Sequence, residues 1–142
     1  MAETFAPEVA GLGTTPTTNA NGGVQGGRLR RFRATVPFAG QAAADTVVLA
    51  DVPAGYAFAY GIINNTATFG ASATIAISVA GATGKYRAAA VQTATGPQLF
   101  GVAAAADNDP LTSGERVILT VAVASLPTSS DFAVIDLYFS AP

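Results

Sequence analysis

The sequence contains no cysteine, no histidine and no tryptophan, and it has few charged residues. Without cysteine there is no disulfide framework, no thiolate nucleophile and no cysteine-based zinc site. Without histidine the chain lacks the commonest general base, the commonest metal ligand and a histidine pH switch. Charged residues make up 11% of the sequence, against about 25% in an ordinary soluble domain. Because few charges keep copies apart, we expect much of the surface to contact other protein.

The sequence also offers little catalytic chemistry. The stretch "GATGKY" at 81–86 has a lysine after a glycine, but it lacks the earlier glycine and the Ser or Thr of a phosphate loop, so we expect a hairpin turn. "DNDP" at 107–110, with Glu115 nearby, has oxygen ligands but not the spacing of an EF-hand, which favours solvated loop carboxylates. No serine lies in a glycine-flanked elbow. We therefore expect a protein that is not an enzyme and that has no cofactor and no metal.

Two further partner classes are disfavoured. The net charge of −2 and the pI of about 4.8 argue against bulk binding to nucleic acid. The charge-free stretch 52–84 is interrupted by proline, glycine and paired asparagines, so it does not predict a membrane-spanning helix. The first residues lack the basic and apolar regions of a signal peptide. We expect neither a nucleic-acid partner nor a membrane partner.

The chain divides by composition into an arm and a body. Residues 1–27 are rich in Thr, Asn, Gly and Pro and have little to bury within one chain, except for Phe5 and Val9. One interpretation is a disordered tail; the other is an arm that orders on a neighbour, with Phe5 and Val9 as anchors. We place the arm, with an arginine-rich hinge, at residues 1–33 and the body at residues 34–142.

The body reads as a series of short strands separated by Gly, Pro, Asn and Ser clusters. Period-2 alternation of apolar residues predicts strands, and no 3.6-residue period or helix cap appears. Such strands at this spacing predict an all-β fold, an antiparallel β-sandwich or jelly roll, with an extended N-terminal arm. The predicted strands are 46–52, 56–63, 74–80, a segment after a turn at Gly84, 115–124 and 132–140.

The alternation also predicts which side chains share a face. We expect Tyr56, Phe58 and Tyr60 to share one face of their strand. The inward positions of the later strands are Ile75, Ile77, Val79; Val117, Leu119, Val121, Val123; and Ala133, Ile135, Leu137, Phe139.

Four of the seven basic residues lie in "RLRRFR", and they are Arg28, Arg30, Arg31 and Arg33. As a strand this segment has no cleanly apolar face, which indicates an edge strand guarded by charge. A second interpretation is contact with phosphate. A third is docking onto an acidic protein surface through bidentate arginine–carboxylate pairs. The side chains of residues 1–33 sum to +2 and those of residues 34–142 to −4, so the arm of one copy would complement the body of another.

Two stretches resemble a known family. "ADTVVLADVPAGYAFAYGIINNTATFGASATIAISVA" and "GKYRAAAVQTATGPQLF", within residues 44–100, are similar to small structural proteins of tailed bacteriophages. The resemblance implies a head decoration (cement) protein with a sandwich or jelly-roll body. It would be commonly trimeric and would sit on the capsid where capsomers meet. It implies no catalytic residues.

From the resemblance and the residues together we expect a structural protein of the virion, located on the capsid surface and made in the bacterial cytoplasm. Its partners would be the major capsid protein and its own copies, as a homotrimer. The arm and hinge residues expected to bind them are Phe5, Val9, Arg28, Arg30, Arg31 and Arg33. The alternative is a head-fibre or receptor-binding module, in which Tyr56, Phe58 and Tyr60 form a glycan-binding patch.

Overall fold

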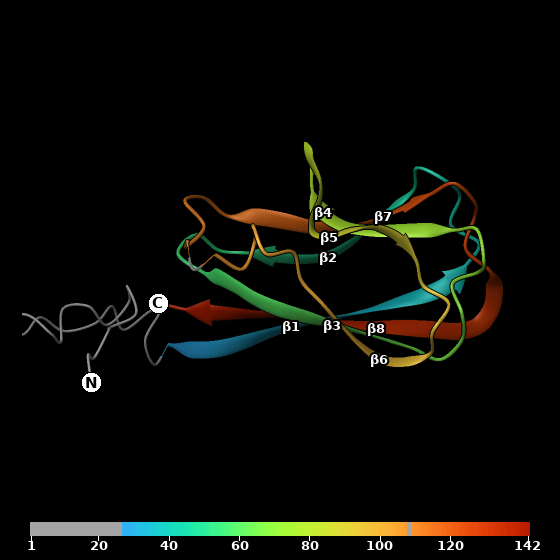
Figure 1. The fold of residues 1–142 in the computed structure, drawn as a ribbon, viewed down its shortest axis with the longest axis horizontal. Helices are drawn as coiled ribbons and strands as arrows, with labels where there is room; N and C mark the ends of the chain where they lie inside the picture. The colour runs from blue at the N-terminus through green and yellow to red at the C-terminus, as the bar shows by residue number, and fades with distance from the viewer. Residues whose placement is uncertain (1–26, 108) are drawn as a thin grey trace, which may run out of the picture.

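The computed structural model describes residues 27–107 and 109–142, and in them the chain forms eight strands and no helix (Figure 1). Within these residues there is accordingly no helix of the length and hydropathy needed to cross a membrane. Every pair of neighbouring strands is antiparallel, so the expected all-β fold is confirmed. The strands are β1 (Arg28–Ala39), β2 (Thr46–Val52), β3 (Ala57–Asn65), β4 (Thr74–Val79), β5 (Ala82–Val91), β6 (Gly96–Phe100), β7 (Glu115–Ala122) and β8 (Thr128–Ala141).

The strands form two four-stranded sheets that lie one above the other (Figure 1). We call β1-β8-β3-β6 the first sheet and β2-β7-β4-β5 the second sheet. Four of the six strand pairs are β1 with β8, β2 with β7, β3 with β6 and β4 with β5, the pairs of one long hairpin folded between β4 and β5; β3 with β8 and β4 with β7 complete the sheets. This order is that of a jelly roll, which decides between the two architectures expected from the sequence.

The core lies between the sheets and follows the predicted alternation of β8 and β7. Each inward side chain of β8 is at most 1% exposed, as are the first three of β7. The prediction for Val123 is wrong, because β7 ends at Ala122 and Val123 is 76% exposed. Val123 has a φ of 72°, and the amide of Ala124 donates to the carbonyl of Ala122 at 2.9 Å, so a γ-turn ends the strand here.

The predicted common face of Tyr56, Phe58 and Tyr60 is also wrong. The register between β3 and β8 shifts between Phe58 and Tyr60, so Ala59 is an extra residue and the alternation reverses there. Phe58 is 5% exposed and its ring packs against those of Tyr86 and Phe139 in the core. Tyr60 points to the outer face instead. An aromatic patch made of these three residues therefore does not form.

The second sheet corrects the position of one turn. The hairpin between β4 and β5 turns at Ala80 and Gly81, because Val79 pairs with Ala82. Gly84, where the sequence suggested the turn, lies within β5. Of "GATGKY", predicted as a hairpin turn, only Gly81 lies in the turn, and residues 82–86 belong to β5.

Strand β6 was not predicted, and one glycine explains how it packs. A Cβ added at Gly61 on β3 would lie 2.1 Å from the ring of Phe100 on β6. The two residues are cross-strand partners. Gly61 therefore lets the Phe100 ring lie directly against the β3 backbone, which holds the end of β6 on the first sheet.

The arginine-rich segment belongs to the sandwich. Residues 28–33 form the first half of β1 and pair with residues 136–141 of β8. The boundary expected between residues 33 and 34 thus falls inside a strand, and the body includes the arginines. Phe5, Val9 and the rest of residues 1–26 lie outside the described residues.

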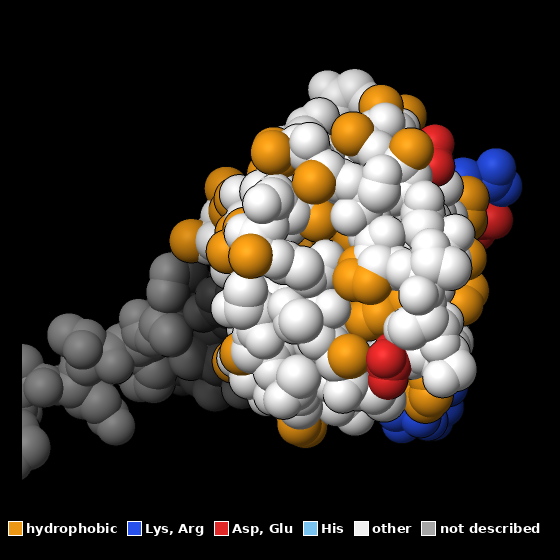
Figure 2. All heavy atoms as spheres, turned by 90° about the vertical axis from the view of Figure 1, so that its right-hand side faces the viewer, with side chains coloured by type: hydrophobic (Ala, Val, Ile, Leu, Met, Phe, Trp, Pro, Cys, Tyr) orange, Lys and Arg blue, Asp and Glu red, His pale blue; other side chains and the backbone are white. Residues whose placement is uncertain are grey.

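At the other end of the sandwich, charged side chains are few (Figure 2).

Candidate functional site

The four arginines lie on an edge strand, and strand alternation divides them into two pairs. β1 is the outermost strand of the first sheet, which confirms the edge-strand interpretation. Arg28 and Arg30 lie opposite Ala141 and Phe139, on the side that faces the second sheet, at the end of the sandwich where the chain enters β1. Arg31 and Arg33 point to the outer face of the first sheet.

Arg33 makes its bidentate ion pair within its own chain. Its Nε and Nη2 donate to the two carboxylate oxygens of Asp136 on β8, each at 2.8 Å. The Asp136 side chain is 9% exposed and that of Arg33 is 53% exposed. The hydrogen bonds from Arg33, followed by the charges of Arg33 and Arg31, hold the pKa of Asp136 below its ordinary value against the opposing effect of burial.

The side chains of the other three arginines are exposed to solvent. Among the described residues, Arg28, Arg30 and Arg31 take part in no ion pair. Arg31 lies opposite Tyr138 on β8, and Tyr138 lies opposite Tyr60 on β3. Arg31, Tyr138 and Tyr60 therefore lie side by side on neighbouring strands of the outer face.

Those two rings form an aromatic pair on the outer face. The rings of Tyr60 and Tyr138 are stacked, with centroids 4.8 Å apart and planes inclined by 21°. The pair exists because the bulge at Ala59 turns Tyr60 outward into register with Tyr138. Sequence alternation alone missed it, since it placed Tyr60 with Phe58.

An apolar groove lies beside the tyrosine pair. Tyr60, Leu99 and residues 100–103 line it together with Ala59 and Ala106, and its volume is about 440 Å³. Leu99 lies opposite Ile62 on the outer face and is 75% exposed. We call this hollow the β3–β6 groove. Its lining contains no charged side chain.

A polar cluster lies at the opening between the sheets. The ammonium of Lys85 on β5 lies 2.5 Å from Oε1 of Glu115 on β7, and the hydroxyl of Tyr86 donates to Oε2 at 2.7 Å. Burial, followed by the hydrogen bond to Glu115, raises the pKa of Tyr86 far above its ordinary value, so the phenol stays protonated. Lys85 and Glu115 neutralise each other. The cluster therefore joins β5 to β7 across β4 and offers no free base.

The loop carboxylates near this cluster do not gather around a cation. Asp107 and Asp109 line a pocket of about 190 Å³ together with Glu115. Asp107 accepts a hydrogen bond from the amide of Asp109 at 3.1 Å, which is local turn geometry. Within residues 27–107 and 109–142, no group of three or more Asp or Glu side chains is placed to hold a metal ion.

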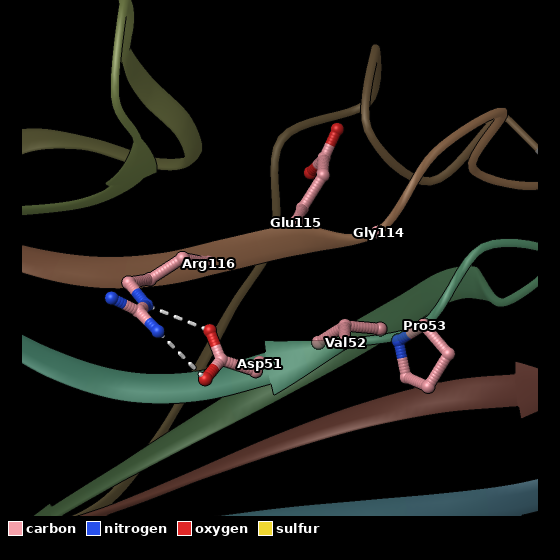
Figure 3. Close-up of a pocket in the computed structure, with 6 residues that line it drawn as sticks. All are labelled: Asp51, Val52, Pro53, Gly114, Glu115 and Arg116. Atoms are coloured by element: carbon pink, nitrogen blue, oxygen red, sulfur yellow. Dashed lines mark hydrogen bonds and ion pairs between the residues drawn. The ribbon is translucent and has the colours of Figure 1, made fainter.

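A second shallow hollow lies at the ends of β2 and β7 (Figure 3). Arg116 binds both carboxylate oxygens of Asp51, at 2.8 and 3.1 Å, while Glu115 points away from this pair (Figure 3). Both side chains are 65% exposed. The hydrogen bonds from Arg116 lower the pKa of Asp51. The two charges of this exposed pair neutralise each other.

Arg87, in the "GKYRAAA" block, has a structural role. Its guanidinium donates to the carbonyls of Ile75 and Ala90 and to the side chain of Gln92. Burial lowers its pKa. The arginine thus satisfies backbone carbonyls where the pairing of β4 with β5 is irregular.

No protein-family model matches the sequence, and no curated protein matches it. Solved structures do share its fold. A chain in the capsid of Ralstonia phage GP4 is 18% identical, with a TM-score of 0.62 over 82% of this chain and 84% of that one. A chain in the capsid asymmetric unit of cyanophage Pam1 is 15% identical, with a TM-score of 0.63 over 82% and 86%.

A third similar chain belongs to the acid-stable capsid of Helicobacter pylori bacteriophage KHP30. It is 13% identical, with a TM-score of 0.59 over 80% of this chain and 88% of that one. All three matches cover four fifths or more of both chains, so most of the fold is shared. At these identities the likeness is one of fold.

Proposed function

We propose that this protein is a structural component of a bacteriophage virion, which decorates the capsid surface and stabilises the shell by bridging neighbouring capsomers. The observation that carries the proposal is the match of four fifths or more of this chain to chains of three phage capsids. The low charge and the absence of cysteine and histidine fit a protein whose surface is largely covered by other protein.

The chemistry of the described residues supports a structural role. The best-formed polar cluster, Lys85–Glu115–Tyr86, is internally neutral and keeps its phenol protonated. Such a cluster stabilises the packing of two strands. A protein assembled in the reducing cytoplasm of a bacterium gains nothing from disulfides, which fits the lack of cysteine.

The attachment site proposed here is the start of β1. Arg28, Arg30 and Arg31 are exposed and unpaired within the described residues, and they lie where the N-terminal segment joins the sandwich. Guanidinium groups bind carboxylates in a bidentate geometry that fixes orientation. The partner is an acidic surface of the major capsid protein, bound by a homotrimer whose closed symmetry limits further association.

The test is binding to phage heads produced without this protein. Wild-type protein mixed with such heads is expected to co-sediment with them, and copies per head can be counted from the gradient fraction. Replacing Arg28, Arg30 and Arg31 by alanine is expected to lower occupancy at least tenfold. Arg116→Ala, an exposed arginine on the second sheet, is the matched control and is expected to leave occupancy unchanged. Wild-type protein that stays at the top of the gradient would overturn the proposal.

The trimer is tested separately by light scattering of the free protein. A mass of three chains is expected. A mass of one chain at every concentration would remove the preformed trimer from the proposal while leaving assembly on the shell.

A further inference from the structure

Since the four arginines belong to β1, the segment that precedes the strand has a negative side-chain charge. Because Arg28–Arg33 belong to β1, the segment that precedes the described residues is residues 1–26. Its only charged side chains are Glu3 and Glu8, so this segment is acidic. Near its start it also carries Phe5 and Val9. Its composition is therefore complementary to the cationic and apolar outer face of the first sheet.

That outer face offers three features in one row. Arg31 on β1 lies opposite Tyr138 on β8, and Tyr138 lies opposite Tyr60 on β3, where the β3–β6 groove begins. Neighbouring strands are about 4.8 Å apart, so Arg31 and Tyr60 are separated by about 10 Å. A polyproline II segment has three residues per turn and rises about 3.1 Å per residue, so three residues span about 9 Å and side chains i and i+3 share a face. Phe5 and Glu8 have this spacing, with Pro7 between them.

We propose that residues 3–9 of the N-terminal segment dock on the outer face of the first sheet of the same chain, with Phe5 in the β3–β6 groove and Glu8 on Arg31. The direction of the chain agrees with this placement. Glu8 is nearer in sequence to β1 and binds at the β1 side of the sheet, while Phe5 is farther and binds at the β3 side. This docking describes the free chain: because the proposed attachment to a capsid also uses Arg31, binding to a capsid would displace Glu8 from Arg31.

The expected Kd and the effective concentration favour docking within the same chain over docking on a neighbouring copy. A seven-residue segment buries far less than the roughly 1,200 Å² of a stable interface, so between two copies it would bind with a Kd of about 0.1–1 mM. In the same chain, the 18 residues between Glu8 and Gly27 have a root-mean-square reach of about 23 Å. That reach exceeds the roughly 14 Å between the outer strands of a four-stranded sheet, so the segment can reach the groove, and it gives an effective concentration of about 1 mM. A contact too weak to join two copies is therefore largely formed within one.

The absence of cysteine makes the test direct, because one introduced thiol is the only one in the chain. Ala103 is exposed and lines the β3–β6 groove. The reactivity of Ala103→Cys in the full-length chain therefore shows whether the N-terminal segment covers the groove. The thiol is expected to react with a maleimide about two- to tenfold more slowly than the same thiol in a chain that also carries Phe5→Ser. Ala82→Cys, an exposed alanine of β5, is the matched control, and its rate is expected not to respond to Phe5→Ser. An unchanged Ala103→Cys rate on Phe5→Ser would overturn the proposal.

Two further arms test the contact and its source. Arg31→Glu is expected to speed labelling of Ala103→Cys, and adding Glu8→Arg to it is expected to restore the slow rate. Failure of this charge exchange to restore the rate would overturn the Arg31–Glu8 contact. In oligomers assembled from Ala103→Cys/Phe5→Ser chains and an excess of wild-type chains, the thiol is expected to stay fast to label, because its own chain lacks Phe5. Protection restored by the wild-type chains would overturn the same-chain assignment in favour of a neighbouring copy.

Discussion

The outer faces of the two sheets differ, although both sheets follow the same alternation. On the first sheet the outward positions carry large side chains: Arg31, the stacked Tyr60 and Tyr138, and Leu99. On the second sheet the outward positions of the inner strand β4 are small and covered, with Ala76 and Ser78 3% and 1% exposed, and the exposed large side chains Val48 and Arg116 lie on β2 and β7. In a jelly roll the outer face of each sheet does not form the core, so its side chains can serve binding. In this chain the outer face of the first sheet carries groups suited to binding.

The two faces also carry ion pairs of the same geometry in different surroundings. Arg33–Asp136 on the first sheet and Arg116–Asp51 on the second are both bidentate. Asp136 is buried, whereas Asp51 is 65% exposed. A buried carboxylate depends on its partner, while an exposed pair contributes little because water competes for both groups.

The largest predicted effect is at the glycine that allows the first sheet to hold β6. Gly61→Ala places a methyl group where the Phe100 ring lies, so the ring must move and β6 must shift. We expect the free energy of unfolding in urea to fall by about 2–3 kcal/mol. Gly101→Ala is the control, because its Cβ would lie at an ordinary 3.6 Å from Phe58. Equal stability of the two variants would contradict this description of the first sheet.

The next effect compares the two ion pairs. Asp136→Asn is expected to lower the free energy of unfolding by about 1–2 kcal/mol at pH 7, and Asp51→Asn by an amount near zero. The pKa of Asp136 is depressed in the folded state, so its contribution is present above the unfolded value of about 3.9 and is lost as pH falls through the folded value. The gap between wild type and Asp136→Asn should therefore shrink below about pH 4. A constant gap down to pH 2 would refute the assignment.

A smaller effect tests the tyrosine pair. In a double-mutant cycle of Tyr60→Ala and Tyr138→Ala, we expect a coupling energy of about 0.5–1.5 kcal/mol from the stacked rings. The measurement is urea unfolding of the four proteins. Additive effects would mean that the two rings do not stabilise each other in solution.

The smallest effect is at the margin of the second sheet. Val123 is a β-branched residue with a φ of 72°, a conformation that suits glycine. Because its side chain is 76% exposed, Val123→Gly loses little packing. We expect Val123→Gly to raise the free energy of unfolding, measured by thermal denaturation, by about 0.5–1 kcal/mol. A loss of stability would show that the valine side chain contributes contacts of its own.

The strand pattern predicted most of the fold because burial on one face forces period-2 alternation, as in β8. It failed at irregular backbone. The bulge at Ala59 reverses the faces of β3, and the γ-turn at Val123 ends β7; neither has a local sequence signal. β6 was missed because "GPQLF" shows no alternation and packs through Gly61 on a distant strand.

The candidate site was only partly predictable for the same reason. Arg33 follows the same pattern as Arg31, and only the register with β8 shows that Asp136 already binds it. The Tyr60–Tyr138 pair joins residues 78 positions apart, through a bulge. The edge-strand interpretation succeeded because it required only the local spacing of charges.

We propose that this protein binds its partner through the outer face of the first sheet and the start of β1. The most direct measurement is thiol labelling on phage heads of two single-cysteine variants, Thr35→Cys on the outer face of the first sheet and Thr46→Cys on that of the second. Both threonines are exposed in the free chain. We predict that binding to heads slows labelling of Thr35→Cys at least tenfold and leaves Thr46→Cys unchanged. Protection of Thr46→Cys with Thr35→Cys still reactive would contradict the account.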